Sequence, residues 1–303
     1  MDKPLKFPIF FIGMPRSGTT VLFEAFSRHP DLAWPSNLTG RFPNYPYLEA
    51  VRALLDNKHW NVIGHKAQYG RHRLGNRYLP HPDEAYNFWN HYAGMDLGRS
   101  ALDKTVPDDA TMQALRQAVA AIVRLQRRQR FSAKFTGPPR ITYLSNVFPE
   151  ARFIHVVRDG RAVLHSLLRV GFWRKKGGYD DLFWDGNFPK SLLEEWERSN
   201  HDPGVLAAVQ WRHIVSRCRT EARALNDGYY TEVKYEDFVA NPEATLLRLT
   251  EFSDLSSCLE IGEYLKNAPR LINMNHKYAE DFSPEYIELL TRVMQPALSE
   301  YGY

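Results

Sequence analysis

An arginine inside a glycine-bounded loop is the first feature of this chain that could do chemistry. Residues 13–18 read GMPRSG, and two threonines follow the second glycine. Two glycines with four residues between them, after an apolar run and before an amphipathic run, outline a phosphate-binding loop whose backbone N–H groups face one anion. We predict that this loop binds an anion through Arg16, Ser17, Gly18, Thr19 and Thr20. The alternative is a tight strand–helix turn with threonine caps.

The loop lacks the lysine of a nucleoside-triphosphate site, because Thr19 stands at the lysine position. A guanidinium at Arg16 can instead form a fork of hydrogen bonds to a phosphoryl or sulfuryl oxygen. Such a contact requires no metal ion, so we expect metal-independent chemistry.

A second candidate anion site lies in the stretch VVRDGRAVLHS, residues 156–166. Arg158 is expected at the carboxyl end of a strand, and Ser166 in the second turn of the helix that follows. Both side chains can donate to one phosphate. Alternatively, they are a surface turn and a small packing residue. A single nucleotide with two separated phosphates would account for both motifs.

The elements that position these motifs follow from the hydrophobic pattern. The apolar runs at 7–12 and 153–157 predict parallel strands that are buried on both faces. Each is followed by a turn and an amphipathic helix, and further helices are predicted at 109–130 and 206–225. Residues 229–239 read as a strand leading into a loop, and prolines begin helices at 242 and 284.

This alternation predicts an α/β fold, a P-loop-like and mostly parallel β-sheet flanked by helices, with ligands where the strands end. We predict a single domain over 1–303. An irregular or helical insert at about 35–130 is expected on the acceptor side. Its aromatic residues should divide between the core and an acceptor cleft: Trp34, Phe42, Tyr45, Tyr47, Trp60, Tyr69, Tyr78, Tyr86, Phe88, Trp89 and Tyr92.

The motifs PRSGTT and FPEARFIHVVRDGRAVLHSLL together resemble the sulfotransferase family. Residues 233–252 are similar to that family's RYEDL segment, and residues 275–303 to the C-terminal segment of protein-tyrosine sulfotransferases and their relatives. The resemblance covers both nucleotide-binding halves and the end of the chain. It implies transfer of a sulfuryl group from 3′-phosphoadenosine 5′-phosphosulfate (PAPS), which leaves as adenosine 3′,5′-bisphosphate, to a hydroxyl or amine.

The resemblance also implies roles for individual residues. The loop residues from Arg16 to Thr20 should hold the 5′-phosphosulfate, and Arg158 and Ser166 the 3′-phosphate. Tyr235 and Lys277 are expected near the nucleotide, although Tyr235 could be a core aromatic and Lys277 a solvated lysine. Arg16 is expected to neutralise the leaving phosphate, and Lys134 to contact the transferring group unless it is an ordinary surface lysine.

The general base does not occur where related enzymes have it. Small-molecule sulfotransferases carry a histidine in a K-T-H stretch, but residues 134–137 here read KFTG. Protein-tyrosine sulfotransferases carry a glutamate after the loop helix, where this chain has Ser36 and Asn37. His65 is our first candidate for the base. The other candidates are His81, Asp83, Glu84 and Asp103, and each could equally be an exposed or capping residue.

Composition limits the partners and the setting. The net charge of +4 is too mild for a nucleic-acid-binding surface, and the run RLQRRQR at 124–130 reads as the charged end of a helix. The apolar runs are too short to span a membrane, and we find no signal peptide. Two cysteines favour the cytoplasm, although Cys218 and Cys258 could pair.

Two other functions remain open from the sequence. A P-loop kinase or NTPase would require magnesium and the lysine that this loop lacks. A nucleotide-binding protein that has lost catalysis would explain the missing base. The acceptor itself could be a small molecule, a carbohydrate or a peptide, and the sequence does not indicate an oligomeric state.

Overall fold

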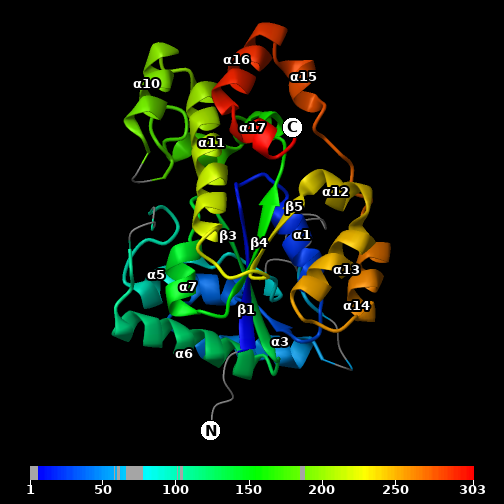
Figure 1. The fold of residues 1–303 in the computed structure, drawn as a ribbon. Helices are drawn as coiled ribbons and strands as arrows, with labels where there is room; N and C mark the ends of the chain where they lie inside the picture. The colour runs from blue at the N-terminus through cyan, green and yellow to red at the C-terminus, as the bar shows by residue number, and fades with distance from the viewer. Residues whose placement is uncertain are drawn as a thin grey trace.

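Five parallel strands form the centre of the structure, in the spatial order β2-β3-β1-β4-β5 (Figure 1). Their bounds are β1 Lys6–Gly13, β2 Leu32–Ala33, β3 Arg130–Thr136, β4 Arg152–Val157 and β5 Tyr230–Lys234. The computed structural model describes residues 6–57, 59, 62–65, 78–100, 102, 105–184 and 188–303. The predicted parallel sheet and its two buried strands are confirmed, whereas β2 and β3 were not predicted.

Helices cover both faces of this sheet (Figure 1). The first half of the chain contributes α1 Thr19–Phe26, α2 Asn37–Arg41, η1 Pro46–Glu49, α3 Ala50–Leu55, α5 Tyr86–Ala93, α6 Asp109–Leu125 and α7 Ile141–Val147. The second half contributes α8 Gly160–Leu167, α9 Gly171–Lys175, α10 Lys190–Arg198, α11 Pro203–Ala222, α12 Tyr235–Ala240, α13 Pro242–Phe252, α14 Leu259–Asn267, α15 Lys277–Asp281, α16 Pro284–Met294 and α17 Ala297–Glu300.

Strand β1 supplies side chains to two separate hydrophobic clusters. Phe10 and Ile12 belong to the cluster formed with helices such as α6, α7 and α11, while Ile9 and Phe11 pack with α1, α13 and α14. Successive side chains of a strand point to opposite faces, so an uninterrupted apolar run requires a cover on both. The fold is therefore a sheet between two helical layers.

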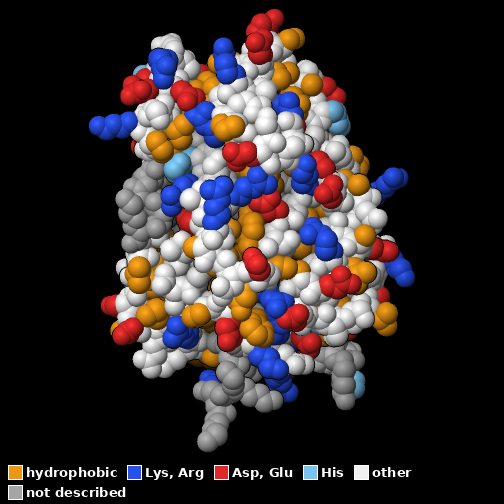
Figure 2. All heavy atoms as spheres, viewed as in Figure 1, with side chains coloured by type: hydrophobic (Ala, Val, Ile, Leu, Met, Phe, Trp, Pro, Cys, Tyr) orange, Lys and Arg blue, Asp and Glu red, His pale blue; other side chains and the backbone are white. Residues whose placement is uncertain are grey.

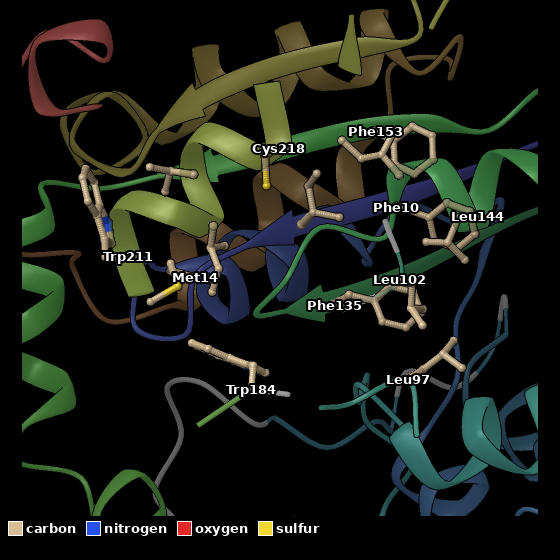
Figure 3. Close-up of a cluster of buried hydrophobic side chains, with 14 of the residues drawn as sticks. Phe10, Met14, Leu97, Leu102, Phe135, Leu144, Phe153, Trp184, Trp211 and Cys218 are labelled. Atoms are coloured by element: carbon tan, nitrogen blue, oxygen red, sulfur yellow. The ribbon is translucent and has the colours of Figure 1, made fainter. Parts of the chain in front are cut away.

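Phe10 lies at the centre of the larger cluster. Its ring lies 5.7–6.4 Å, centroid to centroid, from the rings of five other residues: Trp89, Phe131, Phe135, Phe148 and Phe153. Figure 3 shows Phe10 in the same cluster as Phe153 of β4, Phe135 of β3 and Leu144 of α7. These rings come from β3, β4, α5 and the turn after α7, so one side chain joins the sheet to the helical layer.

Three local predictions require correction. The segment after β5 is not a loop but helix α12, because Tyr235 begins a helix directly at the strand end. The helix that begins at Pro284 ends at Met294, where Pro296 separates it from α17. Helix α6 ends at Leu125, and the following basic run enters β3, where Arg130 is buried and donates to the carbonyls of Phe7 and Ser253.

The segment predicted as an irregular or helical insert contains helices in its described part: α2, η1, α3, α5 and α6. Trp34, Phe88 and Trp89 are fully buried. Four of its aromatic residues are instead exposed: Phe42, Tyr45, Tyr47 and Tyr78. Trp60 and Tyr69 lie outside the described residues. The prediction that these aromatics leave the solvent is thus correct for only some of them.

The surface is mixed in charge. On the face shown in Figure 2, basic and acidic side chains are intermixed, in agreement with the net charge of +4. Among the helices that the structure describes, none is long and apolar enough to cross a membrane. Cys218 and Cys258 are both free thiols.

We expect Phe10→Ala to lower the free energy of unfolding by about 3–5 kcal/mol, because it removes a buried ring from a tightly packed cluster. Urea denaturation monitored by circular dichroism measures this change. Phe42→Ala is the control, since Phe42 is 40% exposed and its loss should change stability by under ~1 kcal/mol. Equal effects of the two substitutions would show that the core is not organised around Phe10.

Candidate active site

The glycine-bounded loop follows β1 directly and ends at the first residue of α1. Arg16 has φ of 71°, a left-handed conformation that non-glycine residues rarely adopt. The backbone N–H and the hydroxyl of Ser17 both donate to the carbonyl of Met14, at 3.2 and 2.7 Å. Ser17 therefore closes the turn, an arrangement that does not favour its predicted contact with the anion.

Gly18 allows the ring of Tyr235 to lie against the loop. It precedes α1 with φ of 87°, and a Cβ atom built on it would lie 2.1 Å from Cδ2 of Tyr235. No residue with a side chain fits this position. Tyr235 is buried, so it is both a packing aromatic and a wall of the loop.

The two candidate anion motifs meet in the structure. Nε of Arg16 donates to Oγ of Ser166 at 2.8 Å, and Nη1 of Arg158 donates to the carbonyl of Arg16 at 3.1 Å. Because β1 and β4 are adjacent and parallel, their carboxyl ends lie at the same edge of the sheet. Residues about 150 positions apart thus form one cationic site.

Arg158 is half-buried and lies against Tyr235, with its Cζ atom 4.5 Å from the centroid of the ring. Burial lowers the pKa of Arg158 from its ordinary value, and Tyr235 and Glu236 act in the opposite direction. A guanidinium that has lost part of its hydration binds an incoming phosphate more strongly than an exposed one. Partial burial is therefore consistent with the predicted role of Arg158 in binding an anion.

A buried lysine occupies β3 beside the loop. Nζ of Lys134 donates to Oγ1 of Thr20 at 2.7 Å and lies 3.3 Å from a carboxylate oxygen of Glu84. The Lys134 side chain is 3% exposed, so the interpretation as an ordinary surface lysine is wrong. The same oxygen of Glu84 accepts a 2.7 Å hydrogen bond from the hydroxyl of Thr136.

These residues open into a cavity of about 450 Å³. Its lining includes Arg16, Thr19, Thr20 and Lys134 from the loop, α1 and β3, and Glu84, which contacts Lys134. The rest of the lining combines aromatic and polar side chains: Tyr86, Asn87, Asn90, Phe172, Phe183 and Trp184. Burial, followed by the Glu84 carboxylate, raises the pKa of Tyr86 to about 12, so its hydroxyl remains protonated. A volume of this size is typical of small-ligand sites.

The base candidates from the sequence lie in different places. His65 faces α1, where its Nδ1 atom is 3.1 Å from Glu24 and 3.1 Å from Arg28, and it does not line the cavity. His81 and Asp83 are also absent from the cavity wall. Asp103 lies outside the described residues. Of the candidates that the structure describes, Glu84 alone lines the cavity with Arg16 and Lys134.

Lys277 is exposed at the start of α15. Within the described part of the chain, no hydrogen bond from Lys277 to the loop or to Arg158 is formed. Two residues before it, Asn275 does contact Arg158, at 2.9 Å.

Sequence reasoning missed Thr136, Trp184 and Asn275. Thr136 could have been found, because it follows Lys134 by two residues and must share its face of a strand. Trp184 could not, since it packs against Gly137, where an added Cβ would lie 2.4 Å from the indole nitrogen, a contact with no local signature.

Comparison with known proteins identifies the family. The model of the sulfotransferase family matches residues 8–258. The chain belongs to the sulfotransferase family. This match includes both anion motifs, Lys134 and the Glu84 carboxylate.

The relatives that match this chain have low sequence identity to it. The protein-tyrosine sulfotransferase of Drosophila melanogaster is 22% identical over 253 residues, 82% of this chain and 38% of the relative. The omega-hydroxy-beta-dihydromenaquinone-9 sulfotransferase of Mycobacterium bovis is 25% identical over 279 residues, 87% of this chain and 65% of the relative. Protein-tyrosine sulfotransferase A of Caenorhabditis elegans also matches, and the chain covers 24% of that relative. The chain therefore spans between 24% and 65% of the length of these three relatives.

Solved structures show the same fold. The sulfotransferase STF9 from Mycobacterium avium superposes with a TM-score of 0.60 at 19% identity, covering 99% of this chain and 78% of that one. The sulfotransferase domain from the curacin biosynthetic pathway gives a TM-score of 0.53 at 16% identity, covering 99% of each chain. The predicted α/β fold with a P-loop-like centre is therefore confirmed.

Gly18→Ala tests the contact between the loop and Tyr235. We expect it to destabilise the protein by more than the ~1 kcal/mol that a left-handed alanine costs, because the Tyr235 ring must also move. Gly94→Ala is the matched control: Gly94 also has a positive φ, of 66°, but an added Cβ meets nothing within 4 Å. Thermal unfolding measures both, and equal losses would contradict the close packing at Gly18.

Proposed function

We propose that this chain transfers a sulfuryl group from PAPS to a hydroxyl acceptor without a metal ion. The observation that carries this proposal is the direct contact between Arg16 and Ser166, which joins two anion motifs beside a cavity with a carboxylate. One nucleotide with a phosphosulfate on its 5′ side and a phosphate on its 3′ side matches two joined cationic sites. The resemblance of both motifs to the family's nucleotide motifs supports the same assignment.

In this proposal the loop binds the 5′-phosphosulfate through Arg16, Gly18, Thr19 and Thr20. Arg158 and Ser166 bind the 3′-phosphate, and Tyr235 lies between the two sites, against both Gly18 and Arg158. The hydroxyl of Ser166 accepts from Arg16, so its own hydrogen can be donated to the ligand. The predicted contact of Lys277 with the nucleotide stays a prediction.

Glu84 is the proposed general base. The acceptor hydroxyl would enter the cavity, lose its proton to the Glu84 carboxylate and attack the sulfur in line with the leaving phosphate oxygen. The S–O bond to that phosphate breaks as the new S–O bond forms. Lys134 lies between Thr20 of the loop and Glu84, where its ammonium can stabilise the sulfuryl oxygens, while Arg16 compensates the charge on the leaving phosphate.

The cavity indicates how the acceptor binds. Phe172, Phe183 and Trp184 provide an aromatic wall, and Asn87 and Asn90 a polar one. The relatives named above carry a tyrosine and an omega-hydroxy-menaquinone in their names, both of which present a hydroxyl on an apolar frame. We propose an acceptor of this kind, held with its hydroxyl toward Glu84.

The insert predicted at about 35–130 would then form the acceptor side of a single domain, since Glu84, Tyr86, Asn87 and Asn90 all come from it.

The free thiols Cys218 and Cys258 favour a reducing, cytoplasmic location.

We expect adenosine 3′,5′-bisphosphate to raise the melting temperature in the presence of EDTA, whereas ATP should do so poorly even with magnesium. Arg158→Ala should weaken binding of the bisphosphate by about 2–5 kcal/mol, because it removes a partly desolvated charge pair. Thermal-shift and calorimetric titrations measure both. Stronger binding of ATP with magnesium would favour a kinase or NTPase instead.

Glu84→Gln should lower kcat about 10²- to 10⁴-fold while bisphosphate affinity stays close to that of the wild type, since a glutamine cannot accept the proton. Transfer of radiolabelled sulfate from PAPS into a panel of hydroxyl acceptors measures the rate. Asp83→Asn is the control, because this neighbouring carboxylate does not line the cavity. Full activity of Glu84→Gln would remove Glu84 as the base, and no incorporation by the wild type would favour a silent binding protein.

A further inference from the structure

An amide, not a carboxylate, orients the guanidinium of Arg158. Nε of Arg158 donates to Oδ1 of Asn275 at 2.9 Å. The other end of this amide donates from Nδ2 to Oε1 of Glu236 at 2.5 Å. An amide can accept from an arginine through its oxygen and donate to a carboxylate through its nitrogen at the same time, without carrying a charge.

Glu236 also accepts hydrogen bonds from two other segments of the chain. Its Oε1 accepts the backbone N–H of Asp159 at 3.2 Å, and its Oε2 accepts the hydroxyl of Tyr303 at 2.7 Å. Burial and the Glu236 carboxylate raise the pKa of Tyr303, so its hydroxyl remains a donor. One carboxylate at the start of α12 thereby fixes Asn275, the turn that carries Arg158 and the end of the chain.

The remaining sides of the guanidinium are also held. Nη1 donates to the carbonyl of Arg16, and the ring of Tyr235 lies against one face. Within the residues that the structure describes, no hydrogen bond is formed by Nη2. The guanidinium therefore has one edge available for a ligand.

We propose that Asn275, itself held by Glu236, is a positioning residue that orients Arg158 for the 3′-phosphate without forming an ion pair with it. A carboxylate at this position would hold Arg158 equally well, but as an ion pair that competes with the phosphate. Because the neutral amide of Asn275 lies between them, the negative charge of Glu236 does not contact the Arg158 guanidinium at this position. This inference rests on the proposed function, because it assumes that Arg158 receives the 3′-phosphate.

The first test compares two nucleotides by calorimetry: adenosine 3′,5′-bisphosphate and adenosine 5′-phosphate, which lacks the group that Arg158 is proposed to bind. Asn275→Ala should reduce the preference for the bisphosphate by about 10- to 100-fold, as expected for a lost hydrogen bond to a charged group, and leave adenosine 5′-phosphate binding unchanged. Asn267→Ala is the control, because Asn267 is exposed and contacts only its own helix. An unchanged preference in Asn275→Ala would overturn the inference.

A charge-exchange variant separates orientation from charge. Glu236→Gln combined with Asn275→Asp retains the hydrogen bonds from Arg158 to residue 275 and between residues 275 and 236, but moves the negative charge next to Arg158. The new amide nitrogen at residue 236 replaces the oxygen that accepts the backbone N–H of Asp159, so we expect a modest loss of thermal stability, shared by Glu236→Gln alone. In the double variant we expect in addition a bisphosphate preference as low as that of Asn275→Ala. A normal preference would show that the neutrality of residue 275 does not matter.

A readout without nucleotide distinguishes this inference from the proposed function. The ¹⁵Nε–¹H NMR signal of Arg158, assigned with Arg158→Lys, should be sharp and slow to exchange in the wild type, and lost or averaged in Asn275→Ala. An unchanged signal overturns the positioning role whether or not the bisphosphate binds. Failure of the wild type to bind the bisphosphate, with the signal changing as expected, would instead count against the proposed function alone.

Discussion

The arrangement of the site depends on the contact between the loop after β1 and the motif after β4. Arg16 donates to Ser166, and Arg158 donates to the backbone carbonyl of Arg16, so neither motif is positioned independently of the other. This contact exists because β1 and β4 are neighbours in a parallel sheet. Residues such as Phe10, which fix the sheet between its helical layers, therefore also fix the geometry of the anion sites.

The contact between the two motifs also concentrates positive charge. The site brings Arg16, Lys134 and Arg158 to one edge of the sheet, and such a concentration of positive charge is unfavourable unless it is compensated or occupied by an anion. Glu84 compensates Lys134 by direct contact, whereas Asn275 separates Arg158 from the Glu236 carboxylate, whose charge still favours the charged guanidinium. The two cations thus differ in how strongly the protein itself neutralises them. This difference agrees with the proposal that Lys134 lies beside the reacting group and Arg158 binds a phosphate.

Much of the fold followed from local patterns. The apolar runs of β1 and β4, the glycine-bounded loop and the prolines that begin α13 and α16 are local signals, and the structure agrees with them. Strand β3 escaped prediction because Arg130 and Lys134 interrupt its apolar pattern, and both are buried only through partners distant in sequence. The packing of Tyr235 against Gly18 could not be predicted from local sequence either, because the contact joins residues far apart in the chain.

The candidate site was only partly predictable for the same reason. Arg16, Arg158 and Ser166 belong to motifs whose spacing carries information, but the base candidates could be ranked only by their surroundings. The sequence favoured His65, which the structure places with Glu24 and Arg28, and Glu84 reaches the cavity because of how the insert folds over β3.

We propose that the two joined motifs recognise one nucleotide by the position of its phosphates, not by charge alone. Adenosine 2′,5′-bisphosphate has the same charge as the 3′,5′ isomer but places its second phosphate on the neighbouring ribose carbon. Calorimetric titration of both isomers in EDTA tests the claim most directly. We expect the 3′,5′ isomer to bind at least tenfold more tightly, a difference of ~1.4 kcal/mol. Equal affinities would contradict it, because they would show a general anion-binding surface in place of a shaped nucleotide site.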